Sequence, residues 1–368
     1  MPRTLGTGAK IALQSPPATA VPSSAAYDRL MALLAAWFIV GLFADGWSHY
    51  HDVRESFFTP YHGVLYAGFF ANLLAVALPM ARNMRAGHAW RDAVPPGYWL
   101  TAVGVGIFAI GVIPDFTWHR VFGIEEGIDV LISPTHLSMG VGLALILLGP
   151  ARSALARSQL PATLDEQWPM LVSLGLFLAE IEFTLQFAFD AGVTTSNAPL
   201  TPSGGSAANL GFFLLPFTYY KEALGITIVV IHAALLAGFA LFMVRNLRPA
   251  PGGITLVFAL PALMMAILLA SSAESFYFPV VEALLAGACA DALAAWLRPD
   301  VDRPKAFLLF AIAVPVIAQG IYLGVSAALL GGVWWDVNMT FGSIFYAGVC
   351  GTFLSLLMLS PKPAASSA

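Results

Sequence analysis

The chain is dominated by continuous apolar segments that are long enough to cross a lipid bilayer. Of its 368 residues, 58% are hydrophobic and only 10% are charged. A soluble globular domain carries about 25% charged residues, and a membrane-spanning helix needs roughly 20 mostly apolar residues. The apolar runs are continuous rather than alternating, which excludes a transmembrane barrel. We therefore predict an all-α fold, a polytopic bundle of transmembrane helices embedded in the lipid bilayer.

The apolar runs predict about ten membrane spans, separated by short polar or Gly/Pro-containing segments. The longest polar interruption, near residues 192–210, is rich in Gly, Ser and Pro and is expected to be an irregular loop outside the membrane. The expected spans are 29–50, 61–82, 97–119, 128–150, 168–191, 220–244, 253–275, 279–297, 305–329 and 338–360.

The basic residues predict the orientation of these spans. With ten spans, fourteen Lys and Arg residues fall on the side of the two termini and three fall on the other side. Lys and Arg are enriched in cytoplasmic loops, so both termini are expected to be cytoplasmic. This predicts a multi-pass protein of the cell (inner) membrane.

Composition also divides the chain and excludes some functions. We expect disordered tails at residues 1–26 and 361–368, four spans within residues 27–150, and six further spans within residues 151–360.

The Lys and Arg residues form no basic stripe, which argues against a nucleic-acid partner. The two cysteines lie in apolar stretches and predict neither a disulfide framework nor a thiolate metal site.

A repeated pattern of acidic, hydroxyl and histidine residues occupies the first four expected spans. In each copy an Asp and a His are four residues apart, and a hydroxyl residue and a Pro precede a second His. The copies are Asp45, His49, Thr59, Pro60 and His62, then Asp115, His119, Ser133, Pro134 and His136. The two copies are offset by about 70 residues and enter the membrane in the same direction, which indicates a duplicated helical hairpin.

One copy of the repeat is enough to assemble a metal site. Asp45 and His49 share one face of a helix because they are four residues apart. Pro60 is suited to the first position of the returning helix, which places His62 at the depth where the first helix ends. One carboxylate and two imidazoles suit zinc or copper, and also non-haem iron. Ionisable residues within spans are costly and tend to mark functional sites, so we predict a metal site on the extracytoplasmic side.

The second copy repeats this arrangement with Asp115, His119 and His136. Other polar residues nearby have less defined roles. His51 is left out of the predicted site. The acidic residues Glu125, Glu126 and Asp129 are either partners that orient the imidazoles or ordinary charges on a wet loop.

The stretch that begins at Asp45, D-G-W-S-H-Y-H-D-V-R-E-S-F-F-T-P-Y-H-G-V-L-Y-A-G-F, resembles the C subunit of the particulate methane and ammonia monooxygenases. The spacing of Asp45, His49 and His62 matches that family residue for residue. The resemblance implies that these three residues bind copper in the membrane and carry the catalysis.

The second copy resembles the family's other motif more loosely. His119, Glu125, Glu126 and His136 map onto it, but Asp115 stands where the family has Asn, and the interval between the histidines is three residues longer. The second metal is therefore left open as copper, iron or zinc. The resemblance covers about residues 40–145, and residues 151–360 have no counterpart that we recognise.

Three functions follow as expectations. The leading one is a copper-dependent membrane oxidoreductase, or the metal-bearing subunit of one, that uses O2 to oxidise a small apolar substrate. It would work with other monooxygenase-type subunits or as a homo-oligomer, and would need an external reductant.

The second expected function is a metal-binding, storage or transport protein without redox turnover. Its transmembrane path would carry Glu180, Glu182, Asp190, Asp291 and Gln319. The third is a zinc-dependent intramembrane hydrolase, which lacks the local His-Glu-x-x-His signature.

Overall fold

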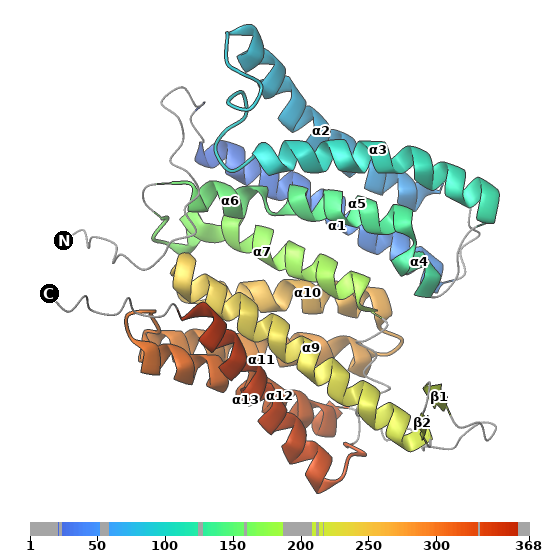
Figure 1. Cartoon of the computed structure of the whole chain (residues 1–368), viewed down its shortest axis with the longest axis vertical. Coiled ribbons are helices and arrows are strands. Elements are labelled where there is room, and N and C mark those ends of the chain that lie inside the picture. The colour runs from blue at the N-terminus through green and yellow to red at the C-terminus, as the bar shows by residue number, and fades with distance from the viewer. Residues whose placement is uncertain are drawn as a thin grey trace, which may run out of the picture. The chain divides into compact units, whose positions relative to one another are not determined.

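The computed structural model describes residues 21, 24–51, 59–123, 128–157, 160–186, 208–210, 213–215, 217–329 and 332–359. The described part is almost entirely helical (Figure 1). The expected tails and most of the polar loop near 192–210 lie outside the described residues. The helices and strands are α1 (Ala25–Tyr50), α2 (Pro60–Arg85), α3 (Trp99–Phe122), α4 (Ile128–Ile132), α5 (Pro134–Leu147), α6 (Gly149–Leu155), α7 (Leu164–Thr184), β1 (Ala208–Leu210), β2 (Phe213–Leu215), α9 (Phe217–Asn246), α10 (Gly253–Leu269), α11 (Ala273–Leu297), α12 (Pro304–Leu329) and α13 (Val337–Met358).

Each of the ten expected spans overlaps at least one of these helices, which confirms the prediction of a helical bundle. Within the described residues, seven helices are long and apolar enough to cross a membrane: α1, α2, α3, α9 over residues 222–246, α11, α12 and α13. The bent pair α5 and α6, which meet at 42°, would make an eighth. Helix α10 is shorter, with 17 residues. Helix α7 carries four acidic residues, Asp165, Glu166, Glu180 and Glu182. The count of ten spans and the orientation stay predictions.

The chain forms two compact units. The first unit comprises residues 13–187 and 256–280, so that α7 belongs with α1 to α5. Helices α3 and α5 pack against each other, as do α1 and α2, and α7 packs against both α1 and α5. Figure 1 shows α3, α5 and α7 running alongside one another. Large apolar side chains, among them Phe38, Phe69 and Phe108, meet at this core, with ring centroids 4.7 to 5.9 Å apart.

Two glycines allow α1 and α2 to approach closely. A Cβ atom on Gly41 would lie 2.5 Å from the Cα of Leu65, and one on Gly68 would lie 2.8 Å from the Cα of Phe38. Small residues at such contacts let helix backbones pack directly in a membrane. The contact between Gly41 and Leu65 lies one helical turn from Asp45 and is close to His62 in the chain. We therefore expect it to set the distance between Asp45 and His62.

A partly buried ion pair lies at the opposite end of α1. Asp28 is 3% exposed, accepts a hydrogen bond from the Tyr98 hydroxyl at 2.8 Å and is paired with Arg157. Asp28 precedes Asp45 by 17 residues, which is about 25 Å of helix.

Replacing Asp28 with alanine should destabilise the first unit. The substitution removes the carboxylate that pairs with Arg157 and accepts a hydrogen bond from Tyr98, and we expect it to lower the free energy of unfolding by roughly 2–3 kcal/mol. Thermal or denaturant unfolding in detergent measures this change. In a double-mutant cycle with Arg157→Ala, the two effects should be less than additive. Additive effects would mean that the pair contributes no coupling energy.

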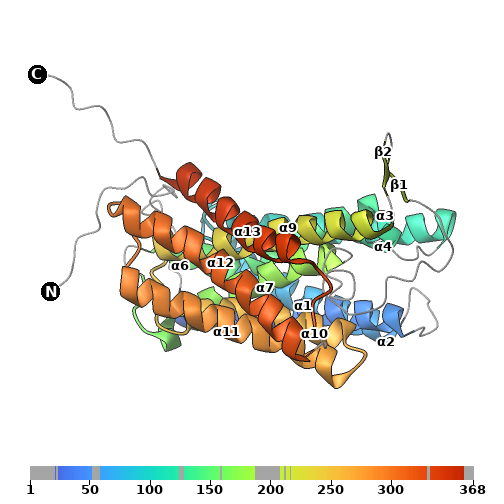
Figure 2. The same cartoon turned by 90° about the horizontal axis from the view of Figure 1, so that it is seen from below.

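The second unit comprises residues 188–255 and 281–368 among those described. Helices α9, α12 and α13 pack against one another (Figure 2). Trp335 is buried with Val229 and Leu323 and also packs against the small residue Gly225. A short antiparallel ribbon, β1 with β2, precedes α9 and pairs Ala208 with Leu215.

Candidate metal centre

The first triad, Asp45, His49 and His62, is assembled by α1 and α2. The Nε2 atoms of His49 and His62 lie 3.7 and 3.4 Å from the same carboxylate oxygen, Oδ2 of Asp45. Among the described residues, no hydrogen bond reaches the other oxygen, Oδ1 of Asp45. The hairpin predicted from the repeat therefore brings its carboxylate and both imidazoles together.

Thr59 and Pro60 explain why His62 occupies this position. Pro60 is the first residue of α2, and the Thr59 side chain caps the helix by accepting a hydrogen bond from the backbone N–H of His62 at 3.1 Å. The same hydroxyl oxygen lies 3.1 Å from Nδ1 of the His62 ring. Thr59 thus holds both the backbone and the ring of His62, and leaves Nε2 directed at Asp45.

The second triad, Asp115, His119 and His136, is assembled by α3 and α5 in the same way. The Nε2 atoms of His119 and His136 lie 3.6 and 3.2 Å from Oδ1 of Asp115. One ligand atom from each of the three residues falls within 4.8 Å of the others, which is close enough to share one metal ion. Among the described residues, only this group meets that criterion.

The backbone around His136 determines that Nδ1 of its ring carries a proton. Ser133 caps α5 and accepts a hydrogen bond from the backbone N–H of His136 at 3.3 Å, while the ring Nδ1 lies 2.6 Å from the carbonyl oxygen of Val130. A carbonyl oxygen only accepts hydrogen bonds, so Nδ1 carries the proton. In the neutral imidazole, Nε2 then bears a lone pair and faces a carboxylate oxygen of Asp115 at 3.2 Å. Two electron-rich atoms at this distance require a cation between them, which is either a proton or a metal ion.

The two triads are close enough to interact electrostatically. The His62 ring interacts with Asp45 and His49 of its own triad and with Asp115 and His119 of the other. Tyr66, one helical turn beyond His62, interacts with both Asp45 and Asp115. Its ring stacks on that of His62, with centroids 6.0 Å apart and planes inclined by 18°. The four helices therefore bring the two triads into one polar cluster.

Tyr66 was not predicted as a member of this cluster. Its spacing of four residues from His62 places it on the same helix face, and this was the only signal available in the sequence. A single tyrosine at that spacing in an apolar helix is more often a packing residue. Its proximity to the second triad depends on how α2 lies against α3, which the sequence does not reveal.

Several other expected residues lie away from the cluster or outside the described part. The His51 ring stacks on Trp47 at 3.9 Å and its Nδ1 is 2.8 Å from the Trp47 carbonyl, consistent with its exclusion from the predicted site. Asp129 is exposed at the start of α4. Glu125 and Glu126, the acidic pair of the second motif, lie outside the described residues.

A buried carboxyl group on α7 lies one helical turn from the second triad. Glu180 is 5% exposed, and its Oε1 lies 3.8 Å from the position that a Cβ atom on Gly140 would take. Gly140 follows His136 by four residues and shares its helix face. Glu180 also hydrogen-bonds with the backbone of Ala144, the next residue along that face. The Glu180 carboxyl group therefore packs beside Gly140, at ordinary van der Waals distance from the Cβ position.

The other polar residues of the expected transport path have structural partners or lie outside the described part. Asp291 on α11 accepts hydrogen bonds from the backbone N–H groups of Ile254 and Thr255, at 3.2 and 2.9 Å, at the start of α10. Gln319 donates to the Ser343 hydroxyl at 3.2 Å. Asp190 is outside the described residues.

No protein-family model, no curated protein and no solved structure matches this chain. The fold and the cluster together define an α-helical protein with several potential membrane spans and an Asp/His site suited to a metal ion.

Proposed function

We propose that this protein is a copper-binding membrane oxidoreductase, or the metal-bearing subunit of one, that oxidises a small apolar substrate with O2. The first triad would hold copper, and the second triad would hold a further ion, either copper, iron or zinc. The observation that carries the proposal is that one ligand atom from each of Asp115, His119 and His136 lies within 4.8 Å of the others, close enough to share one metal ion.

The donor atoms support this proposal. Each triad offers two imidazoles and a carboxylate, a set that suits copper and leaves a coordination position open. In each triad the second histidine, His62 or His136, has its Nδ1 next to an oxygen of the protein. Metal-bound histidines almost always have such a partner, which fixes the ring and the tautomer. Copper rather than zinc is favoured by the resemblance of residues 40–145 to the monooxygenase C subunits.

The residues of the chain would perform the remaining tasks. Asp45 and Asp115 balance part of the charge of the bound ions, and Thr59 holds the ring of His62 in place. Copper bound to the triad would supply the redox chemistry with O2. The surrounding helices expose apolar side chains, including Phe116 and Ile113 on α3, so an apolar substrate can reach the site from the lipid. From the distribution of Lys and Arg, we expect the site to lie on the extracytoplasmic side.

Metal analysis with electron paramagnetic resonance tests the proposal. The purified protein is expected to contain copper and, when oxidised, to give a type 2 Cu(II) signal with nitrogen hyperfine splitting that is lost in His49→Ala. Consumption of O2 with a quinol as reductant should depend on the same residue. A protein that is loaded with zinc and silent in the resonance experiment would overturn the proposal.

A metal carrier is the second candidate function, and Glu180 is the observation that favours it. A carboxyl group buried one turn beyond His136 is a suitable next ligand for an ion that leaves the second triad for the interior of the unit. Buried ionisable residues in membrane proteins often mark ion pathways.

Glu180→Gln separates the two functions. A carrier with this substitution should keep its bound metal but lose at least tenfold in the rate of copper uptake into proteoliposomes, read with an internal metal-sensitive dye. Asp165→Asn, on the same helix with a side chain that is 83% exposed, is the matched control and should transport normally. Absence of uptake by the unmodified protein would exclude the carrier and leave the oxidoreductase.

A further inference from the structure

Helices α9 and α11 end in the same unusual way. A Leu-Arg-Pro sequence begins just after α9, at Leu247, and with the last residue of α11, Leu297, and Arg248 and Arg298 adopt positive φ values of 50° and 48°. The backbone N–H of Arg248 bonds to the carbonyl of Met243, and that of Arg298 bonds to the carbonyl of Ala294. Glycine or asparagine is the usual residue at such a helix end, because a side chain makes the left-handed conformation costly. Two arginines in this conformation suggest that their side chains have a function.

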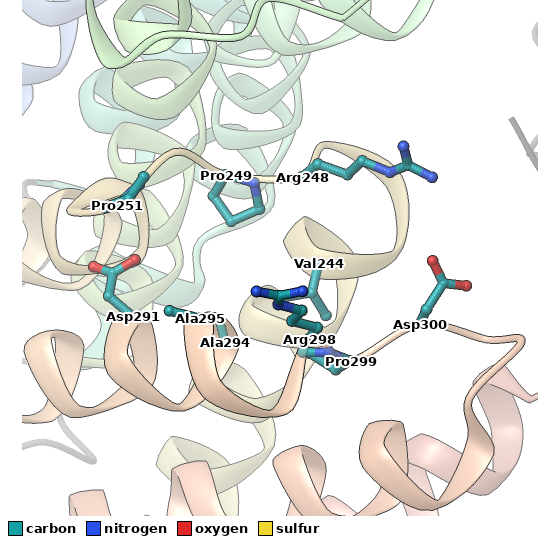
Figure 3. A pocket seen from close by; sticks show the side chains of 10 residues that line it. All are labelled: Val244, Arg248, Pro249, Pro251, Asp291, Ala294, Ala295, Arg298, Pro299 and Asp300. Carbon is teal, nitrogen blue, oxygen red and sulfur yellow. The ribbon is translucent and has the colours of Figure 1, made fainter. Parts of the chain in front are cut away.

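The two arginines line one groove of about 260 Å³ (Figure 3). Three prolines, Pro249, Pro251 and Pro299, form part of its wall, and proline fixes the backbone there. Two carboxylates also line it, those of Asp291 and Asp300. The lining therefore carries two positive and two negative charges on a rigid frame.

The two carboxylates differ in the hydrogen bonds that they accept from the protein. The oxygens of Asp291 accept hydrogen bonds from two backbone N–H groups of α10 and from the Thr255 hydroxyl, at 2.7 to 3.2 Å. This carboxylate is therefore occupied by capping α10. Asp300 accepts one backbone hydrogen bond, from Asp302 at 3.1 Å through Oδ1, and is the carboxylate left to meet a ligand.

The groove lies where α11 would leave the membrane. Trp296, two residues before Arg298, is 75% exposed, and Leu284 and Leu285 near the middle of α11 are 44% and 47% exposed. Leu285 precedes Trp296 by 11 residues, about three helical turns, so these two side chains lie on one face of a helix that is apolar and long enough to span a bilayer. Tryptophan concentrates at the interface between membrane and water. A lipid whose chains lie along this face would bring its headgroup to the level of the groove.

We propose that this groove binds the phosphoethanolamine headgroup of a membrane phospholipid. Arg248 and Arg298 would hold the phosphate, for which guanidinium groups are well suited, and Asp300 would accept hydrogen bonds from the ammonium group. A headgroup that carries both charges matches a lining of both signs, whereas a purely anionic headgroup would meet Asp300 unfavourably. This site is independent of the metal centre.

Native mass spectrometry of the purified full-length chain, titrated with defined lipids, tests the proposal. Phosphatidylethanolamine is expected to bind more tightly than phosphatidylglycerol or phosphatidylcholine, and free phosphoethanolamine at millimolar concentration should compete with it. In the double variant Arg248→Asn and Arg298→Asn, binding of phosphatidylethanolamine should weaken by about tenfold or more.

The variants are chosen to separate lipid binding from folding. Asparagine tolerates the left-handed conformation, so the double variant keeps the helix ends and should unfold at the same temperature as the unmodified chain or higher. Arg85→Gln, an exposed arginine at the end of α2, is the control and should bind lipid normally. Asp300→Asn should remove the preference for phosphatidylethanolamine over phosphatidylglycerol. Equal binding of all three lipids, or unchanged binding in the double variant, would overturn the proposal.

Discussion

His49→Ala should reduce the metal content of the purified protein from two ions per chain to one. The imidazole of His49 lies 3.7 Å from Asp45 and belongs to the first triad alone, while the second triad has its own carboxylate and imidazoles on α3 and α5. Loss of a directly bound ligand should weaken binding by more than the roughly 10- to 100-fold that removal of an outer hydrogen-bonding partner costs. His119→Ala should remove the other ion, and the double variant should bind none. Elemental analysis against protein concentration measures all three.

His88→Ala provides the matched control, because His88 lies in the segment between α2 and α3 and belongs to neither triad. This variant should retain both ions. If His49→Ala lost both ions at once, the prediction of two separable sites would be wrong and the six ligands would form one shared centre. A shared centre is physically reasonable, because the His62 ring interacts electrostatically with members of both triads.

Gly41→Ala should selectively damage the first triad without changing any ligand. The added methyl group would lie 2.5 Å from the Cα and 2.7 Å from the backbone nitrogen of Leu65, so α1 and α2 must move apart. Overpacking of this kind typically costs about 1–3 kcal/mol of stability. The separation of 3.4 Å between Asp45 and His62 depends on the same contact, because Gly41 is one turn from Asp45. We expect metal to be lost from the first triad and retained by the second.

Gly106→Ala is the control for this experiment. A Cβ atom on Gly106, in the middle of α3, would meet no atom within 4 Å. Alanine also favours the helix by up to about 1 kcal/mol over glycine, so this variant should be as stable as the unmodified chain and bind both ions. Equal metal loss in the two variants would show that the contact between α1 and α2 does not position the first triad.

The local parts of the metal centre could be predicted from the sequence because they depend on short spacings. Asp and His four residues apart share a helix face, and Thr59-Pro60 and Ser133-Pro134 are strong signals for a helix start. These rules placed His62 and His136 in the first turns of α2 and α5, as the structure shows. The repeat made the prediction stronger, since the same arrangement appeared twice.

The contacts between segments could not be predicted in this way. The partner of the His136 ring is the carbonyl of Val130, and a backbone carbonyl carries no signature in the sequence. Glu180 packs beside Gly140 on α5, one turn from His136, and Asp291 caps α10 from a helix that follows it in the chain. Each of these contacts depends on which helices pack together, and apolar helices of similar composition do not specify their neighbours by pattern alone.

The sequence by itself thus determined that the chain is a bundle of apolar helices with two hairpins, each carrying an aspartate and two histidines. Helix periodicity and the long apolar runs are local properties, and they suffice for that much. Only the tertiary structure decided that Tyr66 and His62 interact electrostatically with members of both triads, and that the buried carboxyl group of Glu180 packs beside Gly140, one turn from His136. The physical reason is that the packing of helices such as α1 and α2 is set by close contacts at a few small residues, such as Gly41 and Gly68, whose neighbours are distant in the chain.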